Sequence, residues 1–288
     1  MIRKLPFCLA VFLLAALALP LTVFADMGPK PMVTVRLENP PQGIYYLDLL
    51  IAGEDQDYEN LSDEERVQLD PDMLAVLENF SGPDGHPGLA AGTGVPLFGK
   101  LTGDPDGDAM IHVFSYYAVP NEFRLILVKE DQTVTLSDWI RRDTLQVHVT
   151  WDFVSNQISQ PAPFWAYLIQ LLGTLLPTLL IEGVLLLLFR FPLKENWLVF
   201  LLTNLATQLG LFLFLGTQCV TGSYLAYYFA LIPAELIILA VELAVYIPLL
   251  KGKTRIWRAT YAVTANAASC AAGFFLAEPL FRLAMKLV

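Results

Sequence analysis

The sequence predicts a multidomain membrane protein. Its exported domain is expected to be mainly-β (sandwich-like) or α+β, followed by an all-α four-helix transmembrane bundle made of two hairpin repeats. Three observations predict this. The chain opens with a leader of the secretory type, an acidic strand-like stretch follows, and the last part is apolar enough to cross a bilayer four times. The predicted parts are residues 1–25, 26–160 and 161–288.

The first 25 residues have the layout of a signal peptide. Arg3 and Lys4 precede an apolar run, and Ala25 ends a short segment suited to cleavage. We interpret the leader as cleaved after Ala25. An uncleaved anchor is the alternative, because the apolar run is near the lower length limit of a membrane span. Both interpretations place residue 26 outside the cytoplasm.

Charge separates the exported part from the membrane part. Residues 26–160 contain 23 Asp and Glu against 8 Lys and Arg, a net charge of about −15, whereas residues 161–288 contain 5 against 8. This acidic balance argues against nucleic acid as a partner, because phosphates would repel it. The three cysteines lie outside the exported part, at positions 8, 219 and 270, so we expect the domain to fold without disulfides.

The exported part reads as β structure with one helical or irregular insertion. Six runs are rich in β-branched and aromatic residues: Val33–Leu37, Tyr45–Ala52, Met110–Tyr117, Phe123–Lys129, Thr133–Leu136 and Thr144–Phe153. Ser62 and Glu65 predict a capping box for a helix that continues to Leu77. Clusters of Gly and Pro predict a long loop over residues 81–103.

One acidic segment resembles a calcium loop. Asp104, Asp106 and Asp108 stand at alternate positions, but Ala109 replaces the required Gly and Ser115 replaces the required Glu. We interpret the segment as a solvated turn.

The sequence contains no recognisable pattern of catalytic or metal-binding residues. His86, His112 and His148 are the only histidines, and no pair has metal-ligand spacing. No nucleophile arrangement, phosphate loop or metalloprotease motif is recognisable. We therefore expect a protein that is not an enzyme, with no metal and no cofactor.

The membrane part contains four predicted spans, at about 164–190, 197–215, 224–250 and 259–281. The loops at 191–196 and 251–258 carry Lys and Arg, whereas residues 217–223 carry neither. The positive-inside rule places both basic loops in the cytoplasm. This orientation agrees with export of the N-terminal domain and predicts a multipass protein of the cell membrane.

Two carboxylates recur within these apolar spans. Glu182 is followed on the next span by Asn204, and Glu242 is followed by Asn266, at separations of 22 and 24 residues. A basic turn lies between the members of each pair, so the spacing predicts two hairpins of the same orientation. Coincidence is the alternative, because the two halves share few other residues. Ionisable groups at membrane depth are costly and normally face a bundle interior or a cavity.

All four polar residues are expected at a similar depth, roughly 10–14 Å from the cytoplasmic edge at the helical rise. Each Asn has a hydroxyl three residues later, Thr207 or Ser269. Glu235 and Gln208 extend the same helix faces outward. The predicted ligand or coupling-ion residues are thus Glu182, Asn204, Glu242, Asn266, Glu235 and Gln208.

Two interpretations of this layer stay open. With no Lys or Arg at that depth, the carboxylates must be protonated, paired with the Asn amides or balanced by a bound cation. Their hydrogen bonds could simply hold helices together. Alternatively, the layer could bind or pass a proton, a cation or a small polar solute.

Several segments carry a resemblance to a known family. These are Ala25–Pro31, the pair Tyr45 and Tyr46, Phe114–Leu127 and the intramembrane Glu with Asn-x-x-Thr/Ser pattern. Across most of its length the chain resembles an uncharacterised family of Gram-positive bacterial multipass membrane proteins with a signal peptide and an exported N-terminal domain. The resemblance implies topology and lineage, and it implies no activity and no catalytic residues.

The expected function is that of a binding, sensing or assembly component with an extracellular domain. The cytoplasmic loops are too short for an ATP site or a signalling domain, so a signal would have to pass through helix motion to a partner. The expected partners are the lipid bilayer and another membrane or extracellular protein. The alternative is a small transporter or channel that uses the intramembrane Glu and Asn layer.

Overall fold

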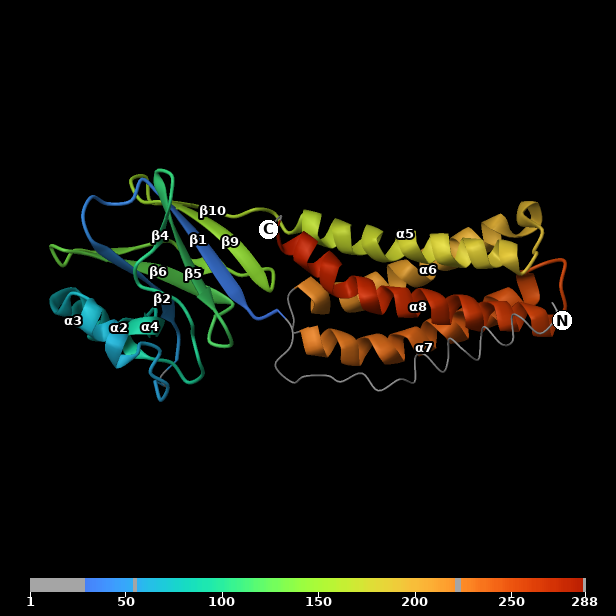
Figure 1. Ribbon diagram of the computed structural model, residues 1–288, viewed down its shortest axis with the longest axis horizontal. Helices are drawn as coiled ribbons and strands as arrows, with labels where there is room; N and C mark the ends of the chain where they lie inside the picture. The colour runs from blue at the N-terminus through green and yellow to red at the C-terminus, as the bar shows by residue number, and fades with distance from the viewer. Residues whose placement is uncertain (1–28, 54–55, 221–223, 287–288) are drawn as a thin grey trace. The chain divides into compact units, whose positions relative to one another are not determined.

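The computed structural model describes residues 29–53, 56–220 and 224–286, and it contains two compact units (Figure 1). Residues 29–163 form a sheet domain, and the residues from Phe164 onward form a helical bundle. The predicted signal peptide, residues 1–25, lies outside the described residues. A β-rich region followed by four apolar helices matches the predicted sheet domain plus helical bundle.

Two β-sheets form the framework of the sheet domain. Sheet A has the strand order β10-β9-β1-β5-β4, with bounds Gln157–Ser159, Gln146–Asp152, Met32–Glu38, Ala109–Ser115 and Asp104–Asp106. Sheet B has the order β3-β2-β6-β7, with β8 also paired to β6, and its bounds are His86–Pro87, Tyr45–Ile51, Glu122–Lys129, Val134–Leu136 and Ile140–Arg141. Strand β1 pairs parallel with β9 and antiparallel with β5.

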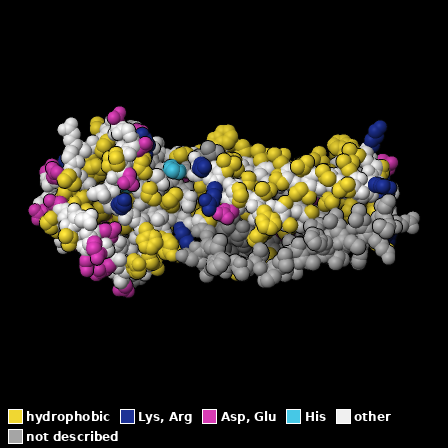
Figure 2. Space-filling view, in the orientation of Figure 1, with side chains coloured by type: hydrophobic (Ala, Val, Ile, Leu, Met, Phe, Trp, Pro, Cys, Tyr) yellow, Lys and Arg dark blue, Asp and Glu magenta, His cyan; other side chains and the backbone are white. Residues whose placement is uncertain are grey.

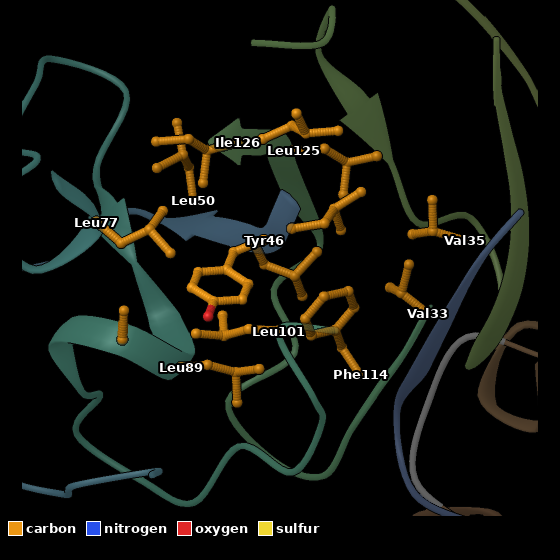
Figure 3. Close-up of a cluster of buried hydrophobic side chains, with 14 of the residues drawn as sticks. Val33, Val35, Tyr46, Leu50, Leu77, Leu89, Leu101, Phe114, Leu125 and Ile126 are labelled. Atoms are coloured by element: carbon orange, nitrogen blue, oxygen red, sulfur yellow. The ribbon is translucent and has the colours of Figure 1, made fainter. Parts of the chain in front are cut away.

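The core lies between the sheets and continues beneath the short helices. Strand β1 alternates buried and half-buried side chains, whereas nearly all of β2 is buried because helices also contact it. Figure 3 shows Leu77 and Leu89 from the helical segment and Phe114 from sheet A around Tyr46 of β2. The Tyr46 hydroxyl also accepts a hydrogen bond from the backbone N–H of Asp70, at 2.6 Å.

The predicted helix is interrupted. The capping box of Ser62 and Glu65 is confirmed, but it begins a short helix, α2, at Asp63–Gln68. A second helix, α3, covers Pro71–Glu78, and Asp70 is its N-cap. Proline is suited to the first turn of a helix and not to its interior, so the single helix expected to continue to Leu77 was wrong.

The predicted loop and turn also hold regular structure. Residues 81–103 contain β3 and a one-turn helix, α4, at Gly88–Ala91. Residues 104–106 pair with β5 as strand β4, so the acidic turn is confined to Gly107 and Asp108. The carboxylates of this hairpin are exposed to solvent, as expected of an acidic surface.

Four long helices form the bundle: α5 at Phe164–Leu188, α6 at Leu193–Val220, α7 at Tyr224–Leu249 and α8 at Arg255–Met285. They contact one another in a ring, in which α5 and α7 each touch both α6 and α8. All four are long and apolar enough to span a membrane, which indicates a multipass membrane protein. Figure 2 shows hydrophobic side chains over much of the bundle surface and acidic ones mainly over the sheet domain.

Side-chain bonds tie the helices together at the end of the bundle where α5 meets α6 and α7 meets α8. Asn196 donates to the carbonyls of Pro192 and Lys251, and its side-chain oxygen accepts from the Lys251 N–H at 2.7 Å. The Trp257 indole donates to the Phe189 carbonyl at 3.1 Å. These bonds join the two short loops that the sequence identified as basic.

Candidate functional site

The polar residues predicted in the spans converge on the bundle interior. The side chains of Glu182, Asn204, Glu242 and Asn266, one from each helix, are between 0% and 6% exposed. Gln208 is also buried, and Glu235 is partly buried. We call these six residues the interior polar cluster. Each helix turns a leucine-rich face outward, so its polar residue faces the interior. On α5, for example, Leu180 and Leu187 are exposed.

The carboxylate of Glu182 is bonded across the bundle to α8. The Ser269 hydroxyl donates to Glu182 Oε1 at 2.9 Å, and the Tyr261 hydroxyl donates to the Glu182 backbone carbonyl at 3.2 Å. Asn204 also lies beside this carboxylate. The first hairpin is therefore linked to the second through Glu182.

The side-chain N–H groups of Asn204 and Asn266 donate mainly to groups other than Glu182 and Glu242. Asn204 Nδ2 donates to the Tyr246 hydroxyl at 2.9 Å and to the Phe200 carbonyl at 3.1 Å, so both of its N–H groups are occupied. Asn266 Nδ2 contacts Glu235 Oε2 at a longer 3.4 Å. Asn204 thus lies beside Glu182, as the hairpin repeat indicated, whereas the Asn266 amide donates to Glu235 and not to Glu242.

Six buried polar atoms in the described part of the bundle have no hydrogen-bond partner, and all six are oxygens. They are Gln170 Oε1, Glu182 Oε2, Asn204 Oδ1, Gln208 Oε1, Glu242 Oε2 and Thr264 Oγ1. Buried polar groups in folded proteins nearly always have a partner, so this excess needs an explanation. Five of these oxygens belong to amide carbonyl or carboxylate groups, and the Thr264 hydroxyl is the one that can also donate, so acceptors predominate among the unpartnered atoms.

The three carboxylates are close enough for their charges to interact. Glu242 interacts with both Glu182 and Glu235, and Glu235 interacts with Glu182. Across the described bundle the ion pair within hydrogen-bond distance joins Arg282 to Glu278, outside the cluster. Carboxylates in an apolar interior cannot all remain ionised without a balancing charge.

The cluster does not form a set of metal ligands. Among the described residues no three His, Cys, Asp or Glu side chains converge as they would around one metal ion. Two of the three histidines of the sheet domain have structural partners: His86 Nε2 contacts the Gly92 carbonyl and His112 Nε2 contacts the Tyr45 hydroxyl, each at 3.0 Å. The chemistry open to the cluster is therefore that of separate carboxylates with neighbouring neutral oxygens.

Aromatic side chains close one end of the polar interior. The rings of Tyr246 and Tyr261 lie 5.6 Å apart, and Phe191 and Phe189 pack on Tyr261 at 5.3 and 5.7 Å. These rings belong to a buried apolar cluster that also contains Leu250. Toward the other end, buried Gln208 and Gln170 continue the polar character.

Sequence reasoning missed several contributors to this site. Tyr246 and Tyr261 were not identified, although Tyr246 stands four residues after Glu242 on the same helix face. The Ser269 hydroxyl was noticed by its spacing from Asn266, but its bond to Glu182 could not be foreseen. Gln170 and Thr264 had no repeat partner that would have drawn attention to them.

Comparison of the chain with protein families, with curated proteins and with solved structures found no match. The resemblance to Gram-positive multipass membrane proteins stays a prediction.

Proposed function

We propose that this protein is a binding or sensing component of the cell membrane whose helical bundle takes up protons at the interior polar cluster. A monovalent cation is the other ligand that the same oxygens would accept. The N-terminal sheet domain is proposed to lie outside the cytoplasm and to present the protein to an extracellular or membrane partner.

The excess of acceptor oxygens carries this proposal. A proton on Glu182 or Glu242 converts one acceptor into a donor, which can then bond a neighbouring oxygen such as Asn204 Oδ1. It also removes a buried charge from a group of three interacting carboxylates. A divalent metal is disfavoured, because it would need several carboxylates converging on one point.

The closed aromatic end favours binding over free passage in this conformation. Tyr246, Tyr261 and Phe191 fill the interior on that side of the cluster. A transporter is the second candidate, and buried Gln170 and Gln208 favour it because they extend the polar interior in the opposite direction. Transport would require the aromatic cluster to open.

Infrared difference spectroscopy on the purified full chain in nanodiscs tests the proposal. A step from alkaline to mildly acidic pH should produce the C=O stretch of a buried protonated carboxyl. The band should be reduced in the double variant Glu182→Gln, Glu242→Gln, which keeps side-chain size, and the part that remains should include buried Asp48 of the sheet domain, whose pKa of about 7 lies in the same range. Glu278→Gln is the matched control, because Glu278 is an exposed glutamate on α8 paired with Arg282.

Addition of Na⁺, Li⁺ or K⁺ at fixed pH separates the two ligands. Suppression of the band by one of these ions would identify a monovalent cation that replaces the proton. Identical spectra for wild type and the double variant, with no response to any ion, would leave helix assembly as the role of the cluster. A folded double variant that fully complements a deletion strain would likewise remove a coupling role.

Orientation is tested by cysteine labelling on intact cells. A cysteine at Lys253 should resist an impermeant reagent, whereas one at exposed Val154 of the sheet domain should react. Labelling at position 253 from outside would reverse the proposed topology.

A further inference from the structure

The two ends of sheet A differ in charge. At the end where β1 finishes, Glu38 pairs with Asp152 in register, and the β4–β5 hairpin adds Asp106 and Asp108. All four carboxylates are at least partly exposed, and Arg36 is the basic side chain bonded among them. This end of the sheet is acidic.

The opposite end of sheet A carries exposed aromatic and aliphatic side chains. Phe98 is 51% exposed and Tyr117 is 54% exposed, flanked by Val113 on the outer face of β5. Tyr116 stacks between the two aromatic rings, with centroids 4.7 Å from Phe98 and 4.8 Å from Tyr117. Lys30 completes the group. We call these five residues the aromatic edge.

Lys30 gives the aromatic edge a positive charge. Its ammonium lies 4.9 Å from the centroid of the Tyr117 ring and donates to the Tyr117 hydroxyl at 3.0 Å. A second ring, that of Tyr116, is 5.6 Å away. Such cation–π contacts hold a lysine against aromatic faces while its charge stays at the surface.

The chain leaves the sheet domain toward the aromatic edge. Strand β10 runs antiparallel to β9, and Ser159 stands opposite Thr150, so the next residues continue in the direction of Gln146. The Gln146 side chain donates to the Lys30 carbonyl at 3.2 Å. Only four residues separate Ser159 from Phe164, which begins the first candidate membrane span. The five steps from Ser159 to Phe164 reach at most about 18 Å when extended.

We propose that the aromatic edge is a membrane-contact surface that rests in the headgroup region of the bilayer into which α5 inserts. Tyrosine, phenylalanine and lysine are the side chains suited to that region, since the rings are amphipathic or apolar and lysine pairs with lipid phosphates. The acidic end of sheet A is the length of β1 away, about 20 Å for seven residues. Anionic lipids repel that end and so favour contact through the aromatic edge.

The short link between the sheet domain and α5, together with the acidic charge of the domain, favours lipid over a protein as the occupant of the aromatic edge. A surface held within a few residues of a membrane span meets lipid at a very high effective concentration. A second copy of this acidic domain would bring net negative charge toward the edge and would be repelled elsewhere on its surface. The inference does not depend on the interior polar cluster.

A fluorescence-quenching experiment on the full chain in nanodiscs tests this contact. With the three native cysteines replaced by serine, a fluorophore is placed at Val113→Cys, within the aromatic edge, or at Val154→Cys, at the acidic end. Both positions are exposed, at 41% and 78%. Headgroup-attached nitroxide lipids should quench the Val113 label several-fold more than the Val154 label, and more strongly in anionic than in zwitterionic lipid.

The double variant Phe98→Ser, Tyr117→Ser distinguishes lipid contact made by these side chains from proximity to the bilayer that results only from the link to α5. Both side chains are half exposed, so the change is compatible with the fold, and retained circular dichroism is the check. Quenching of the Val113 label should fall toward the level at Val154. Unchanged quenching in this variant, or equal quenching at both positions in the wild type, would overturn the proposal. A Val113 label shielded from aqueous iodide but not reached by lipid quenchers would indicate a protein occupant and would also overturn it.

Discussion

The sheet domain and the helical bundle bury polar groups in different ways. In the sheet domain Asp48 is fully buried, and its carboxylate accepts hydrogen bonds from the backbone N–H groups of Leu49, Leu89 and Ala90 at 2.7–3.1 Å. In the bundle Glu242 is equally buried, yet its Oε2 has no partner. One carboxylate holds a segment of the fold in place, and the other has an oxygen without a hydrogen-bond partner.

The difference lies in whether the buried carboxylate oxygens have hydrogen-bond partners. Asp48 attaches helix α4 to strand β2, so its hydrogen bonds explain why a carboxylate is tolerated there. In the described part of the sheet domain the unpartnered buried polar side-chain atom is His112 Nδ1, against six oxygens in the bundle. The described part of the sheet domain thus satisfies nearly all of its buried polar side chains, whereas the described part of the bundle leaves several oxygens without a partner.

The largest expected change in unfolding free energy tests whether the core of the sheet domain is sufficient to keep that domain folded. Residues 29–163 alone should unfold cooperatively, and reductant should have no effect because they contain no cysteine. Phe114→Ala, in the centre of that core, should cost about 3–5 kcal/mol of unfolding free energy. Denaturant titration measures both. A noncooperative, protease-labile product would show that the domain depends on the bundle, and the comparison would fail.

A second prediction uses the pH dependence of Asp48. Burial raises the pKa of Asp48 from 3.8 to about 7, although its three backbone hydrogen bonds oppose the shift. The folded state therefore holds a proton that the unfolded state releases, and stability is lost as pH rises from about 4 to about 7. The advantage of wild type over Asp48→Asn should grow by roughly 4 kcal/mol as pH falls across that window.

His112 supplies the control of opposite sign. Burial lowers its pKa from 6.5 to about 4, so the folded state binds fewer protons than the unfolded state and stability rises with pH in that range. The advantage of wild type over His112→Gln should accordingly grow as pH rises. Urea titrations of the isolated domain at several pH values measure both differences. Parallel curves for wild type and Asp48→Asn would show that the proton on Asp48 does not contribute.

A smaller effect is expected where the bundle does satisfy its polar groups. Asn196 bonds the Pro192 and Lys251 backbones, so Asn196→Ala leaves the Lys251 N–H and carbonyl without these partners. We expect a loss of about 1–2 kcal/mol, seen as a lower melting temperature of the full chain in detergent. Thr260→Ala, which removes an exposed hydroxyl of α8 bonded only within its own helix, is the matched control and should change little.

The smallest expected effect on stability is the most informative one. Glu242→Gln removes the charge of a carboxylate whose Oε2 has no hydrogen-bond partner to lose, so the melting temperature of the bundle should stay the same or rise. Asp48→Asn, by contrast, should destabilise the sheet domain at every pH in the window. A large loss on Glu242→Gln would mean that this carboxylate, like Asp48, is structural.

Much of the secondary structure followed from local pattern. All six predicted runs contain strands, and the four predicted spans overlap α5 to α8. The missed elements are short: β3, β4, β8 and β10 have two or three residues each, and helix α4 has four, too few for a periodic pattern to be recognised. The split between α2 and α3 was missed because Pro71 was not weighed against the capping box.

By itself the sequence determined that Glu182, Glu242 and their asparagines are buried, since charge in an apolar span leaves no other stable position. Tertiary structure alone decided their partners. Glu182 bonds Ser269 of the other hairpin, and Asn204 bonds Tyr246, because the ring of helices sets α5 against α8 and α6 against α7. Helical periodicity determines which face a residue occupies, but the rotation and register of two packed helices determine which atoms meet across it.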